Sequence, residues 1–497
     1  MVKENKRTLV TIALLLSNIM TGMDATIVNT ALPAITGDLH GLAYMGWIVA
    51  TFLLGLAVST PLWSKFGEHR GNKRGYIYST ILFMIGAIFQ GIAPNIQWFI
   101  IARTVMGIGG GGMNTIPFIV FADIYTDLKK RSQIIGLATA LFSTASIIGP
   151  LLGGWIVDVL TWRWVFYLNV PVALLSVTIL MLFYKDTKRN AAGKSVDYLG
   201  ATLLVIGLVS ILTGIQMIGV TSIFVIVTLL VVGIVLIAWM MKVDSKAEDP
   251  IVPSRLLTNR DLVVDFSLFV IIWGSFIAFI TYIPMWAQGI LGLSALMGGM
   301  TQIPGAATNI IGSELVPFLQ TKWSKYLIVT VGTITIFISF VIILLFGQKT
   351  PFWLLLTAGG FEGFGVGIIF NILQVNVQTD AESRDIPTAT SLGYLLRILS
   401  QTLMSSVYGV ILNHALMKGV SESNHTITMR MLNKLSDASA AKQLPQNLVP
   451  EMRNILYSGY RNIMITGLLL IIISMIIVIT MLVYYHKQSL AKKVNLN

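Results

Sequence analysis

The stretch GLATALFSTASIIGPLLGGW, residues 136–155, combines several glycines with one internal proline in an apolar segment. Its GPxxGG core consists of Gly149, Pro150, Gly153 and Gly154. Small residues four apart let two membrane helices approach closely, and an internal proline bends a helix because it removes a backbone hydrogen bond. Ordinary helix packing is the simplest interpretation. The spacing is more specific than that, and it predicts a bent membrane helix with one smooth, tightly packed face.

The composition of the whole chain places this helix in a membrane. Of the 497 residues, 55% are hydrophobic and 11% are charged, and the mean hydropathy is +0.79. Soluble domains carry roughly 25% charged residues, so a water-soluble protein is excluded. The chain has no cysteine, which excludes disulfides, thiolate metal sites and thiol nucleophiles. Its five histidines show no metal-ligand spacing, so no metal site is expected.

Fourteen apolar runs are long enough to cross the hydrocarbon core as helices, which takes about 20 residues each. They cover residues 8–30, 44–64, 76–93, 97–122, 133–158, 163–184, 199–219, 222–242, 263–289, 297–319, 325–346, 351–377, 388–413 and 461–485. The sequence therefore predicts an all-α membrane protein with fourteen spans.

The positive charges set the orientation of these spans. Most of the 34 lysines and arginines fall in loops on one side if both termini lie in the cytoplasm, as the positive-inside rule requires. The same rule explains the net charge of +12 without a nucleic-acid partner. The long loop over residues 414–460 then lies outside, either as an amphipathic cap or as a disordered connector.

Two neighbouring spans differ from the rest. The segments LLVIGLVSILTGI and IFVIVTLLVVGIVLIAW contain no ionisable residue, so they cannot bind a polar solute and either face lipid or are buried. A peripheral insert is the simplest interpretation. It divides the chain into a six-helix bundle over 1–190, a two-helix insert over 195–245, and a second six-helix bundle over 255–497.

Four further motifs accompany the GPxxGG helix. They are MDATIVNTALPAI at 23–35, SKFGEHRGNKRGYI at 64–77, RTVMGIGGGG at 103–112 and WRWVFYLNVP at 162–171. Together the five motifs resemble those of the fourteen-helix drug:proton antiporters of the major facilitator superfamily, over essentially the full chain. The departures are Ala145 for a glycine, Met106 for a glutamine, and Ser64, Glu68, His69 and Asn72 in the 64–77 loop.

The resemblance implies alternating access, in which two halves rock around a central site lined by the first, fourth, ninth and twelfth spans. It implies a proton gradient as the driving force and no cofactor. It also implies that Glu68, Gly71 and Lys73 latch the halves in one state. The remaining positions with implied gating or structural roles are Gly107, Gly149, Pro150, Gly153, Gly154 and Arg397.

Ionisable residues inside spans are the candidate working parts, because a charge in hydrocarbon costs at least about 2.5–3.5 kcal/mol. Asp24 and Arg103 lie at a similar depth, about 9 Å below the outer surface at 1.5 Å per residue. They are expected to pair, either for proton coupling or as a purely structural salt bridge.

Glu362, in GGFEGFGVG near the middle of its span, is the best candidate for the exchanged proton. Removing a carboxylate from water favours its protonated form, although a neutral glutamate bonded to a neighbour would serve structure alone. Glu314 is a possible second proton site or an interfacial residue. Asp265 is expected to be solvated near the cytoplasm.

Aromatic side chains on the ninth and twelfth spans predict an apolar pocket whose π faces suit cations. Trp273, Tyr282, Trp286 and Phe361 are the candidates, although tryptophan also favours membrane interfaces. The expected substrate-binding set is Asp24, Asn29, Trp273, Tyr282, Trp286, Gln288, Phe361 and Glu362.

The sequence thus predicts a monomeric, proton-coupled antiporter in a bacterial plasma membrane, which exports amphipathic cationic or zwitterionic drugs. A narrow-specificity exporter of a lipid-like or endogenous metabolite, or a membrane receptor, is the alternative. An enzyme is disfavoured: no Walker motif exists, and GIGGGGMN lacks the strand, lysine and aspartate of a phosphate-binding loop.

Overall fold

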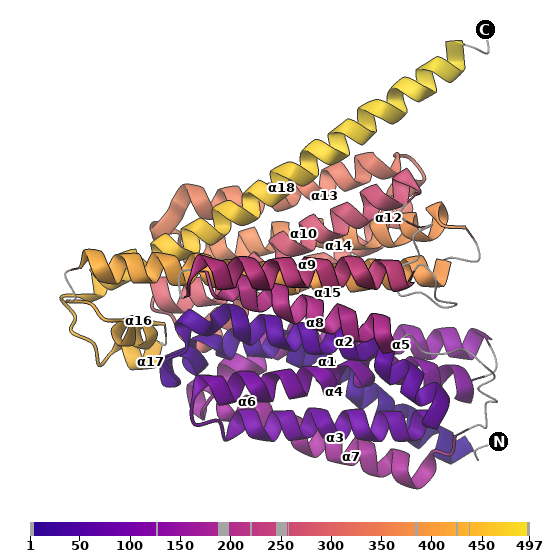
Figure 1. Cartoon of the computed structure of the whole chain (residues 1–497), viewed down its shortest axis with the longest axis horizontal. Coiled ribbons are helices and arrows are strands. Elements are labelled where there is room, and N and C mark those ends of the chain that lie inside the picture. Colours follow the sequence, from indigo (N-terminus) through magenta and orange to yellow (C-terminus); the bar gives the residue numbers. More distant parts are fainter. Residues whose placement is uncertain are drawn as a thin grey trace. The chain divides into compact units, whose positions relative to one another are not determined.

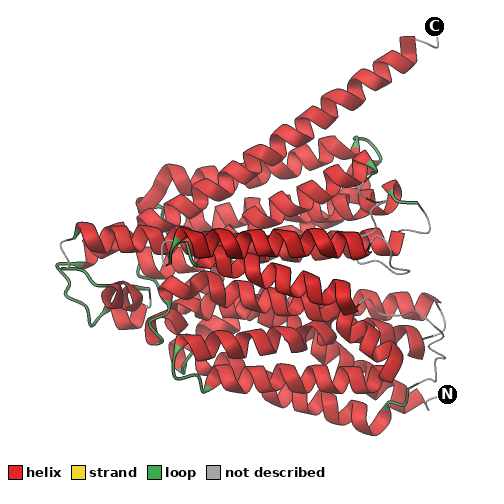
Figure 2. Cartoon of the chain, in the orientation of Figure 1, coloured by secondary structure: helices red, strands yellow, loops and turns green. Residues whose placement is uncertain are grey.

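The computed structural model describes residues 4–125, 128–186, 198–218, 221–244, 256, 258–382, 386–423, 426–436 and 438–494. Within these residues every regular element is a helix (Figure 2). The fold is therefore all-α, as predicted from the hydropathy.

The helices of the N-terminal part follow the predicted spans closely. Their bounds are α1 Glu4–Asp38, α2 Met45–Arg70, α3 Asn72–Gly91, α4 Ile96–Ile124, α5 Leu128–Val159, α6 Arg163–Tyr167, α7 Asn169–Phe183, α8 Tyr198–Gln216 and α9 Ile223–Asp244. A 3₁₀ turn, η1, covers Leu42–Tyr44. Asn95 begins α4, because its side chain accepts a hydrogen bond from the Trp98 N–H at 2.9 Å.

The C-terminal helices vary more in length, and short turns interrupt them. Their bounds are α10 Arg260–Met285, α11 Ala295–Met300, α12 Ile303–Gln320, α13 Lys325–Phe346, α14 Phe352–Asp380, α15 Ile386–Glu422, α16 Met429–Leu435, α17 Ala438–Ala441 and α18 Val449–Val494. A π-helical turn, η3, continues α10 over Trp286–Ile290, and a 3₁₀ turn, η4, covers Gly347–Lys349. The longest described helix is α18, with 46 residues (Figure 1).

Nine helices in the described ranges are long and apolar enough to cross a membrane, or ten if the two parts of α1 count as one span. Those two parts, Lys6–Asp24 and Thr26–Asp38, meet at a 44° bend. The predicted count of fourteen is thus not confirmed. Helices α3, α5, α8 and α12 cover predicted spans, but they do not meet the same standard of length and apolarity over the described residues.

The chain divides into two compact units. The first unit is Met1–Ile251, Pro284–Met300 and Ser405–Gly459, and the second is Val252–Ile283, Thr301–Met404 and Tyr460–Asn497. The three-part division predicted from the sequence stays a prediction.

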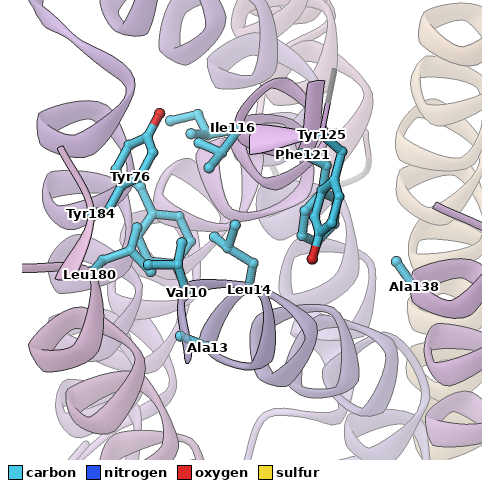
Figure 3. Packing of buried hydrophobic residues seen from close by; sticks show 11 residues of the cluster. Val10, Ala13, Leu14, Tyr76, Ile116, Phe121, Tyr125, Ala138, Leu180 and Tyr184 are labelled. Carbon is cyan, nitrogen blue, oxygen red and sulfur yellow. The ribbon is translucent and has the colours of Figure 1, made fainter. Parts of the chain in front are cut away.

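In the first unit, α1 packs against α5, and α4 packs against α2 and α3. One apolar cluster joins α1, α3, α4, α5 and α7, and includes Leu14, Tyr76, Phe121 and Leu180 (Figure 3). The Tyr76 hydroxyl lies inside it and bonds to the hydroxyls of Ser17 and Ser176. This polar chain satisfies a phenol that would otherwise be buried without a partner.

Helices α8 and α9 pack against each other through glycines. A Cβ at Gly233 would lie 2.7 Å from the Gly207 carbonyl oxygen, so the two backbones are in close contact. Only 17% of the α9 span is buried, against 61% for α4. The peripheral insert stays a prediction.

The loop predicted over residues 414–460 is largely helical where the structure describes it. Helix α15 continues to Glu422, α16 and α17 follow, and α18 begins at Val449. The Asn433 Oδ1 atom accepts a hydrogen bond from the Leu42 N–H at 3.1 Å, and the Ser436 hydroxyl lies 3.3 Å from the Pro33 carbonyl oxygen. The disordered-connector interpretation is therefore wrong for these residues, because buried polar contacts hold them against the end of α1.

In the second unit, α14 packs between α12 and α13. Glycines make the α12–α14 contact close: a Cβ at Gly363 would overlap the Gly305 backbone. Glu362 directly precedes Gly363, so its backbone lies at this contact.

Candidate functional site

Asp24 of α1 and Arg103 of α4 form a buried ion pair. The Arg103 Nη1 atom lies 3.4 Å from Asp24 Oδ2, and their side chains are 6% and 1% exposed. The guanidinium also lies over the Phe52 ring of α2, with Cζ 3.9 Å from the ring centroid. The structure thus brings together the two charges that the sequence placed at the same depth. Their role in proton coupling stays a prediction.

Two amide side chains beside this pair were missed from the sequence. Gln90 of α3 is fully buried, and its Nε2 donates to the Met106 sulfur at 2.8 Å. Asn169 of α7 is buried and lies near the Asp24 carboxylate. An amide inside an apolar span is costly unless it is bonded, and that signal could have identified both residues.

The glycines of the GPxxGG core face two different helices. A Cβ at Gly149 would lie 2.6 Å from the Thr26 hydroxyl of α1, and one at Gly153 would lie 2.6 Å from Ile27 Cγ1 of the same helix. A Cβ at Gly154 would instead meet the Leu296 backbone of α11. The expectation of one smooth face was wrong, because consecutive helical residues point about 100° apart.

The contact between α5 and α11 involves three parts of α5. The Pro150 carbonyl meets Gly299, Gly154 meets Leu296, and one turn later Asp158 receives hydrogen bonds from two backbone N–H groups. These donors are Ala295 at 3.0 Å and Leu296 at 2.9 Å. Asp158 was not singled out from the sequence, because an acid near a helix end resembles an ordinary exposed residue.

The loop between α2 and α3 is held by the end of α7. Gly71 has φ +100°, which favours glycine, and a Cβ there would overlap the Asp186 carboxylate. The Lys73 N–H donates to Asp186 Oδ1 at 2.8 Å, and its Nζ donates to the Met181 and Tyr184 carbonyls, each at 2.7 Å. The side chain of Glu68 lies outside the described residues. The latching role implied for this loop stays a prediction.

Three more candidates for substrate binding lie in the first unit, and all are buried. Asn29 lies on α1, whereas Trp286 and Gln288 lie in η3. Trp286 packs edge-on against Tyr457, with centroids 5.5 Å apart, and the Gln288 Nε2 donates to the Thr30 carbonyl at 3.2 Å. Gly107 packs α4 against α2, since a Cβ there would overlap the Phe52 carbonyl.

Glu362 of α14 is a buried carboxylate of the second unit. It is 5% exposed, and its Oε1 atom has no hydrogen-bond partner among the residues that the structure describes. A Cβ at Gly305 of α12 would lie 3.8 Å from Glu362 Oε2, so a glycine lies beside the carboxyl. An ionised carboxylate without a cation or donors is strongly disfavoured at such a position. The arrangement favours a carboxyl that holds a proton.

Phe361 and Glu314, the other candidates from α14 and α12, are not buried as Glu362 is. Phe361 is 38% exposed, because adjacent residues of α14 point in different directions. Glu314 is exposed on α12, nine residues beyond Gly305 in the chain. The structure therefore does not bring either residue to the buried side of Glu362.

Aromatic rings surround Arg397 of α15. Its Cζ lies 5.4 Å from the Trp273 ring centroid, 5.0 Å from that of Phe370 and 4.9 Å from that of Tyr394. Cation–π attraction explains how a guanidinium is accommodated at this depth. Tyr282, the remaining aromatic candidate, packs against Tyr460, with centroids 5.9 Å apart.

Asp265 of α10 is fully buried, with 0% exposure. The expectation that water solvates it was wrong, because Asn376 of α14 covers it and donates to its Oδ1 atom at 3.4 Å. Among the described side chains, no group of three or more histidines or acids is arranged to hold a metal ion.

Comparison with known proteins adds the family context. Residues 14–404 match the family model described as Major Facilitator Superfamily. "Multidrug resistance protein 3" of Bacillus subtilis (strain 168) is 30% identical, over 94% of this chain and 93% of that protein. "Multidrug transporter protein MdtP" of the same organism is 28% identical, over 94% and 91%. A fungal relative, "Efflux pump dotC" of Dothistroma septosporum, is 28% identical, over 87% and 75%.

Solved structures show a similar fold. A bacterial homologue of the human lysosomal transporter Spinster, crystallised in an inward-facing and occupied conformation, aligns with a TM-score of 0.65 at 15% identity, over 96% of this chain and 97% of that one. A D-xylose–proton symporter aligns with a TM-score of 0.60 at 13% identity, over 89% and 99%. At these identities the likeness concerns the fold alone.

Proposed function

This chain belongs to the Major Facilitator Superfamily, a family of membrane transporters rather than enzymes, and we propose that it is a proton-coupled antiporter that exports amphipathic drugs. The names of its relatives in Bacillus subtilis support drug export. The proposal of proton coupling is based mainly on one observation: Glu362 is buried, and its Oε1 atom has no hydrogen-bond partner among the described residues.

The exchange follows from the chemistry of that carboxyl. With the proton bound, Glu362 is neutral and tolerates its apolar surroundings. When a cationic compound or water reaches it from the cytoplasmic side, the ionised form is stabilised and the proton leaves to the cytoplasm. Reprotonation from outside then releases the compound there. One group that binds either a proton or a cation is sufficient to couple the two flows.

Charges of both signs support cationic or zwitterionic substrates. Glu362 offers a negative charge when ionised, and Arg397 offers a positive charge among the rings of Trp273, Phe370 and Tyr394. Aromatic and apolar surfaces nearby suit the hydrophobic part of an amphipathic molecule. The first unit adds a buried ion pair of its own, Asp24 with Arg103.

We further propose fourteen spans, cytoplasmic termini and a monomer in a bacterial plasma membrane. A helix lies over each predicted span in the described ranges, including the four that fall short of the stricter standard. The lysines and arginines are distributed as the positive-inside rule requires for this orientation. No cofactor enters the proposal, because the proton gradient supplies the energy.

The test is transport in proteoliposomes with an imposed pH gradient. A panel of fluorescent cations and zwitterions is followed with the gradient in either direction, with no gradient, and with a protonophore. The proposal predicts movement of at least one compound against the proton flow, which stops with the protonophore. Transport at the same rate with and without the pH gradient would contradict the proposed antiport.

A further inference from the structure

A second buried carboxyl, Asp265, lies elsewhere in the second unit and takes no part in the exchange described above. It is fully buried on α10, and its Oδ2 atom has no hydrogen-bond partner among the described residues. Its other oxygen accepts one long hydrogen bond, 3.4 Å, from Asn376. An ionised carboxylate normally needs more donors than this when it is buried.

The nearby cation is already engaged by other acids. The Lys325 Nζ atom of α13 lies 2.6 Å from Asp380 Oδ2 and 3.5 Å from Asp261 Oδ2. Asp261 also accepts hydrogen bonds from the hydroxyls of Tyr326, at 3.2 Å, and Tyr485, at 2.6 Å. These contacts satisfy Asp261 and Asp380 as anions.

Three carboxyls therefore share one lysine. Lys325 interacts electrostatically with Asp265 across the cluster, while Asp261 and Asp380 oppose a negative charge there. The facing groups are Asp261 on α10, Lys325 and Tyr326 on α13, Asn376 and Asp380 on α14, and Tyr485 on α18. Asp261 and Asp380 as anions already exceed the single positive charge of Lys325. Asp265 forms no ion pair among the described residues, so its neutral form is favoured.

We propose that Asp265 is a second proton-binding carboxyl, separate from Glu362, and that Lys325 is the cation that stabilises it when the proton has left. The step moves only a proton, from the Asp265 carboxyl to water. Lys325 then turns from Asp380 toward Asp265, which weakens the ion pair between the start of α13 and the end of α14. The use of this step in transport rests on the proposed antiport, but the protonation itself does not.

The protonation is tested by infrared spectroscopy on the purified protein, without any substrate. A protonated aspartic acid has a carbonyl stretching band that shifts when aspartate is labelled with ¹³C, which separates Asp265 from Glu362. We expect this aspartic band at neutral pH in the wild type and its loss in Asp265→Asn. Asp24→Asn, in the first unit and away from this cluster, is the control and is expected to keep the band.

A second variant keeps the test independent of how well Asp265→Asn folds. Lys325→Gln removes the cation that favours the ionised form, so the band is expected to persist to higher pH, by about one pH unit or more. The proposal would be overturned if the wild type lacks the aspartic band at neutral pH, or if Asp265→Asn keeps it. It would also be overturned if the pH dependence of the band is the same in Lys325→Gln as in the wild type. If the wild-type protein shows the band but no pH-driven transport, the proposed antiport is contradicted instead.

Discussion

The backbone N–H of Leu296 donates a hydrogen bond of 2.9 Å to the Asp158 carboxylate, one turn beyond the point where Gly154 meets the same residue. Two elements far apart in the sequence, α5 and α11, are thus joined by close packing and by a polar contact. We propose that this contact is a gate, which breaks when alternating access separates α5 from α11.

Gly154→Leu is expected to hold this gate open. A larger side chain cannot fit against the Leu296 backbone, and overpacking costs about 1–3 kcal/mol. A cost of about 1.4 kcal/mol in the closed state changes the ratio of open to closed protein about tenfold. The measurement is labelling of Thr30→Cys, a buried position next to Gly299, with a membrane-impermeant thiol reagent. The native chain has no cysteine to interfere.

The matched control for the gate is Gly110→Ala on α4. A Cβ there would lie 3.7 Å from its nearest neighbour, the Phe83 ring, so no change in labelling is expected. Gly153→Leu is expected to disturb α1 packing and stability rather than the gate, since Gly153 faces Ile27. Equal labelling of the Gly154→Leu and Gly110→Ala proteins would contradict the proposal that this contact is a gate.

The ion pair of Asp24 and Arg103 leads to a double-mutant prediction. Asp24→Asn or Arg103→Gln alone leaves one buried charge without its partner, a loss of about 3–5 kcal/mol. The double variant removes both charges and is expected to lose less than the sum of the two. Thermal unfolding of the purified variants measures the coupling. Additive losses would show that the two charges do not interact in solution.

The α8–α9 pair is expected to affect stability alone. Gly233→Val places side-chain atoms against the Gly207 carbonyl, at a cost of about 1–3 kcal/mol. A lower unfolding temperature with an unchanged substrate profile is the expected outcome. A changed profile would argue against a peripheral insert.

The segment with α16 is held to η1 by Asn433. Asn433→Ala leaves the buried Leu42 N–H without its acceptor, which costs about 1–3 kcal/mol. Faster hydrogen exchange across α16 is expected. Arg430→Ala, an exposed position on the same helix, is the control and is expected to change nothing. Equal exchange in the two variants would mean that Asn433 does not anchor the segment.

The sequence predicted where most of the long helices lie, because runs of apolar residues mark them, but it did not predict α16 and α17, which lie outside such runs. The span boundaries place Asp24 and Arg103 at a similar depth in the membrane, and this predicted that the two side chains form a pair. Burial of Asp265 was missed, since distance from a helix end does not reveal that Asn376 of another helix covers it. The direction of Gly154 was also missed, because neighbouring helices decide which of two adjacent glycines faces which partner.

The role of Asp158 could not be read from the sequence either. Its hydrogen-bond donors are backbone N–H groups of α11, and backbone groups carry no sequence signal. Side-chain type predicts where a charge is costly, but tertiary contacts decide what satisfies it.

The most direct measurement of the central claim is pH-driven transport by Glu362→Gln in proteoliposomes, beside exchange of labelled for unlabelled compound without a gradient. Glutamine mimics the protonated carboxyl and cannot release a proton. We predict that gradient-driven export is lost in this variant while Glu314→Gln, at an exposed position on α12, keeps it. The Glu362→Gln protein is expected to fold and to unfold at a temperature close to that of the wild type. Normal gradient-driven export by Glu362→Gln would contradict the account.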